Sequence, residues 1–274
     1  MSIVFYNSEY VDSSDVKISP ENRSLNYGDG FFESIKIINS KPFNFSAHFN
    51  RFTLACKTLK MNNAFSKKEI VLIIEQLINK NEIVNGTLKM HVSRIEGGKY
   101  CPKSSAMYLL ISTSEGDIFV LNNKESLCFY NEEVKSKGKL SNIKSANALV
   151  SVMSSLFANE KEFSNSILFN SDGNIIETSN SNIFILKNGE LFTPPTSDGC
   201  VKGTMRSWVL SQLKVTERTL SVSDINNASE IFTTNAINGI ISVDKVEEQS
   251  FSEFDIANKL QARLLELTFD ELLE

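Results

Sequence analysis

The sequence has few histidines, and this shortage excludes several kinds of catalytic site. Only His48 and His91 occur among 274 residues. A metal centre of three histidines is therefore impossible, and a Ser-His-Asp triad has at most two candidates for its base. We predict no metal ion and expect lysine, tyrosine or carboxylate side chains to perform any acid–base chemistry.

The sequence also lacks paired cysteines, blocks of basic residues and long apolar runs. Its four cysteines lie far apart without a C-x-x-C motif, as expected of reduced thiols in the cytoplasm. The net charge is −5, and no run of Lys or Arg points to nucleic acid. The most apolar stretch, 70–78, is too short to cross a bilayer, and the N-terminus resembles no signal peptide. We expect a cytoplasmic protein with neither a nucleic-acid nor a membrane partner.

The first half of the chain has the pattern of a compact α+β unit. Apolar residues at helical spacing predict a helix over 46–61, and Ser66 with Glu69 forms a capping box that opens a second helix through Asn79. Four strands flank these helices, over 3–6, 31–38, 87–94 and 107–113. We predict a small N-terminal α+β domain over residues 1–113 and an interdomain linker over residues 114–121.

The second half, residues 122–274, is predicted to form a larger C-terminal domain. A helix begins just after Lys144, and five of its apolar residues share one face: Ala146, Leu149, Val150, Met153 and Phe157. Two hairpins turn at 171–174 and 188–189, and another helix follows Gly203. A final helix starts after Ser252. Strands are predicted near 215–222, 229–234 and 239–246.

Lys144 and Glu177 are candidate catalytic residues because of where they stand. Lys144 ends an extended stretch before a predicted helix, and an amine held there can be desolvated into a base or nucleophile. Glu177 ends an apolar strand before small polar residues, where a carboxylate can face a buried cationic nitrogen. Taken singly, each also fits an ordinary solvated side chain.

Two further positions can bind an anion. Gly203 opens a helix after a loop rich in proline and glycine, so the amides of Thr204 and Met205 would suit a phosphate. A plain helix cap by Thr204 is the alternative. Arg51 borders the apolar face of the first long helix, where its guanidinium can reach inward to a phosphate or carboxylate, or lie at the rim of the core.

Two loops could line a pocket. Tyr27 and Phe32 stand in a glycine-bracketed loop that enters a strand, although a β-bulge or turn explains the same glycines. Lys89 and His91 share one face of the strand that ends at Arg94, and a basic loop follows. These cations could bind a substrate carboxylate or belong to a solvated hairpin.

In their order, these segments resemble the fold-type IV enzymes that use pyridoxal 5'-phosphate (PLP), also called class IV aminotransferases. The resemblance covers about residues 3–246, nearly the whole chain. It implies a two-domain, D-amino-acid aminotransferase-like fold of the α+β class and a homodimer. The matching segments are Asn22-Arg23, Tyr27–Glu33, His48–Phe52, Lys144, Asp172–Glu177, Ser181–Phe184, Thr193-Pro194, Gly203–Arg206 and Thr234–Ala236.

The resemblance implies a role for each matching residue. Lys144 corresponds to the lysine that forms the Schiff base with PLP and shuttles protons, and Glu177 to the carboxylate beside the pyridine nitrogen. The residues implied around the cofactor phosphate are Arg51, Thr204, Met205, Asn235 and Ala236. The candidate substrate-binding residues are Tyr27, Phe32, Lys89 and Arg94.

Three functional hypotheses follow. The Gly97-Gly98 loop after Arg94 resembles that of the aminodeoxychorismate lyases, which convert 4-amino-4-deoxychorismate to 4-aminobenzoate and pyruvate for folate synthesis. The Phe32-Glu33 pair is commoner in the aminotransferases. We predict a lyase of this kind. The alternative is an aminotransferase acting on branched-chain or D-amino acids with a 2-oxo acid acceptor, and the third hypothesis is a catalytically inactive PLP-fold protein that serves as a binding partner.

Overall fold

The computed structural model describes residues 2–269, which form two compact units. Of the described residues, the first unit contains 2–118, the segment Ile143–Asn147 and 267–269. The second unit contains Phe119–Asn142 and Ala148–Glu266. Both units combine helices with sheets that are wholly or mostly antiparallel, so the α+β class predicted from the sequence is confirmed.

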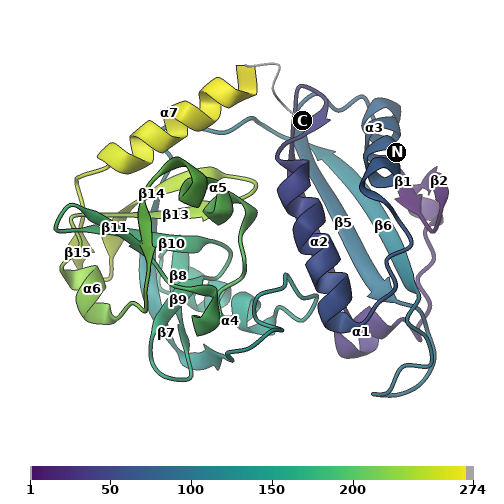
Figure 1. Ribbon diagram of the computed structural model, residues 1–274, viewed down its shortest axis with the longest axis horizontal. Helices are drawn as coiled ribbons and strands as arrows, with labels where there is room; N and C mark the ends of the chain where they lie inside the picture. The colour runs from purple at the N-terminus through teal and green to yellow at the C-terminus, as the bar shows by residue number, and fades with distance from the viewer. Residues whose placement is uncertain (1, 270–274) are drawn as a thin grey trace. The chain divides into compact units, whose positions relative to one another are not determined.

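The first unit is a six-stranded antiparallel sheet with three helices (Figure 1). The strand order is β2-β1-β6-β5-β3-β4. The strands are β1 (Ile3–Tyr6), β2 (Glu9–Asp12), β3 (Gly30–Ile38), β4 (Lys41–Pro42), β5 (Gly86–Arg94) and β6 (Met107–Glu115). The helices are α1 (Arg23–Tyr27), α2 (Phe45–Leu59) and α3 (Lys67–Lys80).

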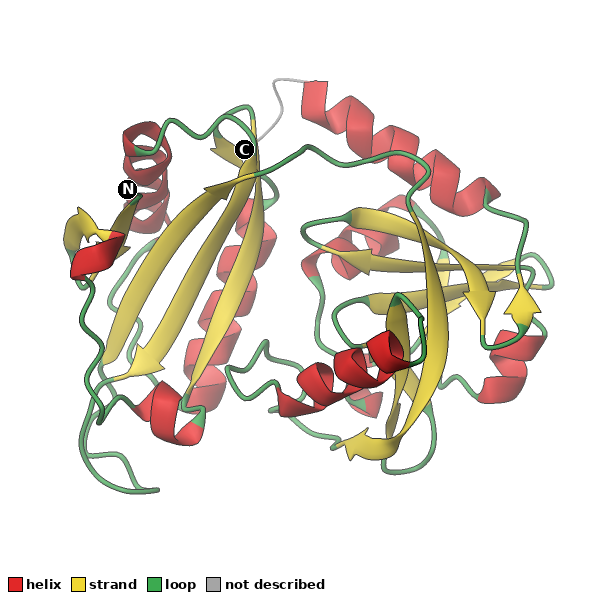
Figure 2. Cartoon of the chain, turned by 180° about the vertical axis from the view of Figure 1, so that it is seen from behind, coloured by secondary structure: helices red, strands yellow, loops and turns green. Residues whose placement is uncertain are grey.

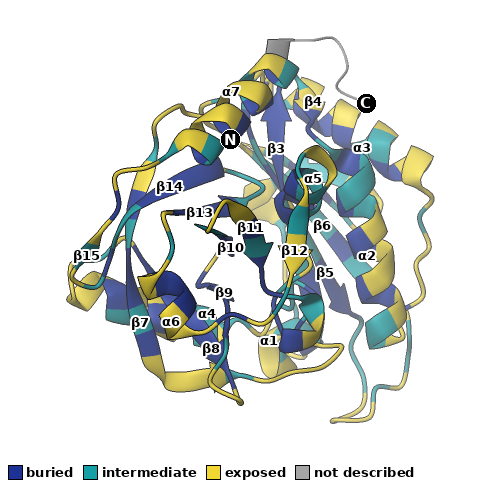
Figure 3. Ribbon diagram, turned by 60° about the vertical axis from the view of Figure 1, so that its left-hand side comes forward, coloured by how far each residue is buried: buried dark blue, intermediate teal, exposed yellow. Residues whose placement is uncertain are grey.

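The helices α2 and α3 pack on one face of this sheet (Figure 2). Alternate residues of β3, including Phe31 and Ile35, are fully buried there, and the Phe31 ring lies 5.4 Å from the ring of Phe52 on α2. The inner side of α2 is buried and its outer side is exposed (Figure 3). The predicted capping box of Ser66 and Glu69 is confirmed, and α3 starts directly after it.

The second unit is a nine-stranded sheet whose ends approach each other. The path of strands is β12-β11-β10-β13-β14-β7-β8-β9, with β15 paired to β14. Ile175 of β9, at one end, forms a bridge with Leu220, which follows β12 at the other end. The strands are β7 (Lys124–Lys135), β8 (Asn165–Asn170), β9 (Ile175–Thr178), β10 (Asn182–Lys187), β11 (Glu190–Thr193), β12 (Val215–Glu217), β13 (Glu230–Asn235), β14 (Gly239–Val246) and β15 (Gln249–Ser250). The helices are α4 (Leu149–Glu160), α5 (Thr204–Gln212), α6 (Val222–Asn226) and α7 (Asp255–Phe269), of which residues 267–269 are counted with the first unit.

Both predicted hairpins of this unit form. In the β10–β11 turn, Asn188 and Gly189 adopt φ of 53° and 78°, the left-handed conformation that a tight two-residue hairpin requires. The predicted strand over 215–222 is wrong in its second half, because the chain turns after β12 and enters α6. Ser221 and Asp224 form the capping box of that short helix.

The strand β7 was not predicted from the sequence. Its apolar centre, from Leu127 to Tyr130, is short and lies between charged ends, so the sequence carries only a weak strand signal. In the structure β7 runs parallel to both β14 and β8, which buries this centre on both sides. Pairing with strands distant in sequence therefore creates an element that the local pattern does not show.

The helix predicted to begin just after Lys144 starts five residues later, at Leu149. The intervening segment is held in an extended form by β3, since the amide of Phe32 donates to Lys144 O at 2.9 Å and the amide of Ala146 donates to Gly30 O at 3.0 Å. Ile143, just before it, is 3% exposed in the core of the first unit. These contacts place Lys144 with the first unit, whereas the sequence assigned it to the C-terminal domain.

Candidate active site

The candidate site residues fall into two groups, one in each unit. In the first unit, Lys144 lies beside the start of β3, and its Nζ is 4.8 Å from the centre of the Phe32 ring. Its backbone is fixed by the hydrogen bonds to β3, so the amine projects from a defined position. A lysine held in this way has the placement that a nucleophile or proton carrier needs.

Arg51 lies in a buried cluster with Glu33 and His48. The guanidinium of Arg51 donates to both carboxylate oxygens of Glu33, from Nε at 2.7 Å and from Nη2 at 2.6 Å. The Nδ1 of His48 lies 2.7 Å from Glu33 Oε2. All three side chains are at most 7% exposed. Sequence reasoning named Arg51 but gave neither Glu33 nor His48 a place in the site.

The charges in this cluster shift two pKa values. Burial by itself raises the pKa of Glu33, but the charge and hydrogen bonds of Arg51 and the contact with His48 outweigh it and lower the pKa to about 2. Burial lowers the pKa of His48, and the charges of Arg51 and Lys144 lower it further against the opposing effect of Glu33. Glu33 is therefore ionised and His48 is neutral near pH 7.

The second face of the sheet carries polar and cationic side chains beside Phe32. The antiparallel register pairs Phe32 with His91 and Ser34 with Lys89, so all four side chains project from the same face. The Nζ of Lys89 lies 5.0 Å from the centre of the Phe32 ring, which Lys144 also approaches. The structure thus brings the predicted residues Lys144, Phe32 and Lys89 together.

Arg94 does not project from that face. Its Nε donates to Asp29 at 2.9 Å, and its terminal nitrogens donate to the backbone oxygens of Leu59, Lys60 and Ser104. The residue is 5% exposed. The predicted substrate-binding role of Arg94 therefore gives way to a structural one, in which the guanidinium ties the end of β5 to the end of α2.

Tyr27 lies at the end of α1 and is 42% exposed. Its ring lies 4.9 Å from the guanidinium carbon of Arg23 and 5.7 Å from the ring of Tyr100. Arg23 in turn donates to Asp29 and to the carbonyls of the Gly97–Lys99 loop. Tyr27 thus belongs to an aromatic and cationic group that organises the glycine-containing loop after β5.

In the second unit, Glu177 is 6% exposed at the middle of β9. Its Oε1 forms an ion pair with Nζ of Lys135, and its Oε2 accepts a hydrogen bond from the amide of Val201 at 2.8 Å. The unpredicted strand β7 supplies Lys135, which the sequence gave no role. The carboxylate is held from two sides in an orientation that the backbone defines.

The start of α5 has the features of a phosphate site. Gly203 is the residue before the helix and has no side chain with which to cap the first amides, while Thr204 and Met205 are buried. A side chain at position 203 would place its Cβ 1.9 Å from Asn182 Oδ1, so only glycine fits. Asn182 also donates to Val201 O at 2.9 Å. Sequence reasoning did not assign Asn182, although it directly follows the run of small polar residues after Glu177.

Asn235 shapes the loop between β13 and β14. Its Oδ1 accepts from the amides of Ile237 at 3.0 Å and Asn238 at 2.8 Å, and its Nδ2 donates to Ser181 Oγ at 2.9 Å. The neighbouring Thr234 is buried, and its Oγ1 has no hydrogen-bond partner among the residues that the structure describes. Ala236 follows in a partly buried position. A buried hydroxyl without a partner beside an ordered turn marks a place where a polar ligand fits.

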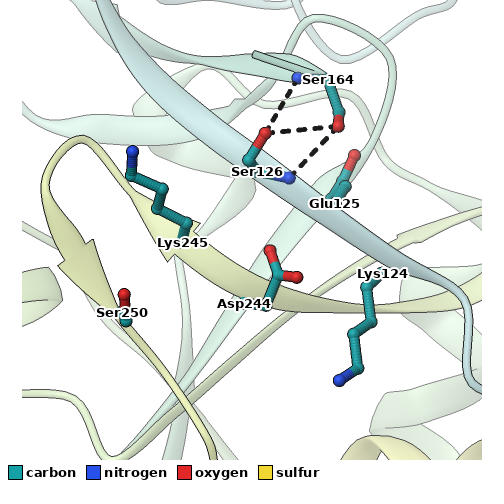
Figure 4. A pocket seen from close by; sticks show the side chains of 7 residues that line it. All are labelled: Lys124, Glu125, Ser126, Ser164, Asp244, Lys245 and Ser250. Carbon is teal, nitrogen blue, oxygen red and sulfur yellow. Dashed lines mark hydrogen bonds between the residues drawn. The ribbon is translucent and has the colours of Figure 1, made fainter.

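A separate pocket of about 380 Å³ lies elsewhere in the second unit and contains none of these residues (Figure 4). It is lined by Lys124, Glu125, Ser126, Ser164, Asp244, Lys245 and Ser250. Across residues 2–269, no cluster of three His, Cys, Asp or Glu side chains could hold a metal ion. Within the same residues, no helix is long and apolar enough to cross a membrane.

The sequence profile of Amino-transferase class IV matches residues 30–246 of the chain. This protein belongs to the class IV aminotransferase family. A Methanocaldococcus jannaschii protein provisionally named as a branched-chain-amino-acid aminotransferase is 27% identical over 256 residues, covering 89% of this chain and 88% of its own. The D-alanine aminotransferase of Staphylococcus epidermidis is 22% identical over 262 residues, which is 92% of each chain.

Solved structures of the family share the fold. The 4-amino-4-deoxychorismate lyase of Pseudomonas aeruginosa matches with a TM-score of 0.83 at 20% identity, covering 96% of this chain and 98% of the other. The branched-chain aminotransferase of the archaeon Thermoproteus uzoniensis, solved with norvaline, matches with a TM-score of 0.91 at 18% identity, covering 97% and 94%. The predictions of a fold-type IV fold and of a class IV enzyme are confirmed.

Proposed function

We propose that this class IV enzyme uses PLP and converts 4-amino-4-deoxychorismate to 4-aminobenzoate and pyruvate. The observation that carries the choice of substrate is the cationic, polar face around Phe32, next to Lys144. 4-Amino-4-deoxychorismate carries two carboxylates in addition to its amino group. A substrate with a branched apolar side chain would instead require an apolar wall, whereas the neighbours of Phe32 on this face are Lys89, His91 and Ser34.

The residues present fit PLP. Lys144 offers an amine for the aldehyde, and Glu177 offers a buried carboxylate for the pyridine nitrogen. The backbone amides at the start of α5 and the guanidinium of Arg51 are donors of the kind that a phosphate requires. The partnerless hydroxyl of Thr234 adds a donor or acceptor that a ligand would satisfy.

The chemistry divides between the cofactor and this chain. PLP supplies an electron sink for negative charge at the substrate carbon that bears the amino group. Lys144 supplies the base: its Nζ takes the proton from that carbon and returns a proton to the departing three-carbon group, which leaves as pyruvate. Lys89 binds a substrate carboxylate and so orients the ring, and Phe32 forms the wall between the two amines.

The alternative reaction is transamination of branched-chain or D-amino acids with a 2-oxo acid acceptor. Two observations favour it: the Phe32-Glu33 pair, and the sequence similarity to the two relatives named as aminotransferases. This reaction would also use Lys144 as the proton carrier, but the amino group would remain on the cofactor until the acceptor arrives. The two reactions therefore differ in whether an acceptor is needed.

The enzyme is incubated with 4-amino-4-deoxychorismate without any 2-oxo acid, and the release of pyruvate and 4-aminobenzoate is measured. We expect both products in equal amounts. Exchange of amino groups between L-leucine or D-alanine and 2-oxoglutarate, with no pyruvate from 4-amino-4-deoxychorismate, would replace the lyase with the aminotransferase.

The cofactor is tested by the absorption band at about 410–420 nm that PLP gives when it is bound covalently to lysine. We expect this band in the wild-type enzyme and its loss, together with activity, in Lys144→Ala. A protein that stays colourless with added PLP would instead support an inactive binding role.

We further propose a homodimer, supported by the exposed side of α4. Leu149, Val152, Met153 and Leu156 recur at helical spacing and are 46–69% exposed. The stripe contains no charged residue, so a second copy of the same stripe can pack against it without burying an unpaired charge. A stripe of this kind is more apolar than the exposed surface of most helices.

The cysteines support the proposed location in the cytoplasm. All four thiols are free, and three of them, Cys56, Cys128 and Cys200, are buried. Burial raises the pKa of Cys56 to about 12 and that of Cys200 to about 12, so these thiols are protonated and unreactive at neutral pH. Free cysteines are typical of proteins in a reducing compartment.

A further inference from the structure

The buried cluster of Glu33, His48 and Arg51 is the feature of the first unit that the proposed reaction does not explain. His48 and Arg51 stand three residues apart on α2 and therefore share one face of that helix. Glu33 lies on the face of β3 that packs against α2, and it is 1% exposed between the apolar residues Phe31 and Ile35. The fold thus places a carboxylate where an apolar side chain would otherwise complete the core.

The contact between Glu33 and Arg51 fixes the direction of the guanidinium. Bonds from Nε and Nη2 to the two carboxylate oxygens form a planar, bidentate pair. This pair uses two of the five N–H groups of the arginine and fixes the plane in which the other three lie. Because the carboxylate also cancels the charge of Arg51, anion binding by Arg51 depends on the direction of its N–H groups more than on net charge.

His48 holds Glu33 from the other side, and we call Glu33 and His48 together the clamp on Arg51. Glu33 is ionised, so the nitrogen that faces it, Nδ1, must carry the proton and donate to Oε2. Glu33 Oε2 accepts from Arg51 Nη2 as well, so this oxygen is held from both sides. His48 therefore restricts the carboxylate in the same way as the carboxylate restricts Arg51.

The cluster stands close to Lys144. The charge of Lys144 acts on His48, and Phe32, the residue before Glu33, donates its amide to the backbone of Lys144 at 2.9 Å. The residues that orient Arg51 and the lysine proposed to bind the cofactor thus belong to the same compact unit.

We propose that Glu33 and His48 are positioning residues that hold the Arg51 guanidinium in the orientation that binds the phosphate of PLP. This inference rests on the proposed use of PLP. A long arginine side chain loses rotamer freedom when it binds an anion, and a clamp formed on folding removes that cost from the binding step. Glu33 and His48 touch neither substrate nor cofactor in this role.

The test compares PLP with pyridoxal, which has the same aldehyde and ring but no phosphate. Full-length apo-protein is titrated with each compound, and the covalent adduct with Lys144 is followed by its absorption. We expect Glu33→Gln to weaken PLP binding by about tenfold or more and to change pyridoxal binding by less than about twofold. Equal weakening for both compounds, or no weakening for PLP, overturns the inference.

Variants of His48 provide an independent arm if Glu33→Gln does not fold. His48→Asn keeps an N–H donor near the position of Nδ1, whereas His48→Ala removes it. We expect His48→Ala to weaken the binding of PLP but not that of pyridoxal. We expect His48→Asn to retain most of the wild-type affinity for PLP. Equal PLP affinity in these two variants counts against the clamp.

Glu230→Gln is the matched control for loss of a buried carboxylate. Glu230 is fully buried in the second unit, where it accepts from the amides of Ile256 and Ala257 at the start of α7. We expect this variant to bind PLP and pyridoxal as the wild type does, and selective loss of PLP binding in it would contradict the inference. A wild-type protein that binds neither compound would refute the proposed function rather than the clamp.

Discussion

Glu33 shows how a buried charged side chain in this protein replaces hydration with hydrogen bonds to fixed side chains. A buried carboxylate is costly unless cations and hydrogen-bond donors surround it, and Arg51 and His48 supply both. Asp29 repeats this solution near the surface. Burial opposes its ionisation, but hydrogen bonds and charge from Arg94 and Arg23 lower its pKa. Two acidic residues close together on the chain thus serve to orient arginines.

The pH dependence of stability follows from the lowered pKa of Glu33. Its folded-state pKa is about 2 and its usual value is 4.5, so its contribution is fully present above pH 4.5 and is lost as the pH falls toward 2. We expect the free energy of unfolding to fall more steeply over that range in the wild type than in Glu33→Gln. Urea titrations followed by circular dichroism at several pH values measure the two slopes, and equal slopes would show that folding does not lower the pKa of Glu33.

At the residue scale, the sequence predicts which residues lie near a site better than it predicts the side chains that bind them. The sequence predicts Arg51 and Arg94 as cations near a pocket. In the structure, Arg51 pairs with Glu33 and Arg94 pairs with Asp29. Both acids belong to the same short loop and strand that the sequence had singled out. Which acid meets which arginine depends on the packing of α2 and β5 against β3, and no local spacing encodes that packing.

At the scale of elements, helix α4 differs most clearly from its prediction in the placement of its apolar residues. Its apolar residues occupy more than one face, because Val150 and Phe157 pack against the core of the second unit while Leu149 and Met153 are exposed. The sequence predicted that all four lie on one face. Periodicity detects that a helix is apolar, but it does not state what covers each side.

Changes to the exposed side of α4 test the proposed homodimer. The double variant Val152→Glu with Leu156→Glu adds charge to the stripe at positions that are 50% exposed in the single chain. We expect the mass measured by light scattering to fall from that of a dimer to that of a monomer, with the thermal midpoint of the monomer unit little changed. Ser155→Glu, an exposed position to the side of the stripe, is the control and should remain dimeric. A wild-type protein that is monomeric by light scattering would contradict the proposed homodimer.

Elements with strong local signals were predicted well. The helix α3 carries its own capping box, and the β10–β11 hairpin carries its own Asn-Gly turn. The strand β7 was missed because its pairing partners, β8 and β14, come from later parts of the chain. The difference lies in whether the stabilising partner is near or far in sequence.

At the scale of the whole molecule, the two units share one chain in an interleaved order. The segment Ile143–Asn147 belongs to the first unit, yet it stands between Asn142 and Ala148 of the second. Asn142 is bound within its own unit, where its Nδ2 donates to the carbonyls of Thr196 and Cys200 at 2.8 Å. Lys144 is thus anchored by packing on one side and by its chain neighbours on the other.

Ile143→Ala tests the contribution of this segment to the first unit. Removing a buried isoleucine side chain costs about 2–5 kcal/mol when the cavity does not collapse. The single tryptophan, Trp208, lies on α5 in the second unit, so its fluorescence reports on that unit alone. We expect the denaturant midpoint measured by circular dichroism to fall, with a smaller change in the midpoint measured by Trp208 fluorescence. Equal shifts by both probes would mean that the units unfold together.

The interleaved order also determines when the first unit can finish folding during synthesis. The six strands of the first sheet are complete by Glu115, but the core that they enclose lacks Ile143 until the chain has grown well beyond them. The bond from Asn39 Nδ2 to Thr268 O, at 2.8 Å, forms only after residue 268 has been added to the chain. The sheet of the first unit is therefore synthesised before the second unit, but the unit is completed after it, and the apolar core residues that wait for Ile143 are the surface that a nascent-chain chaperone would meet.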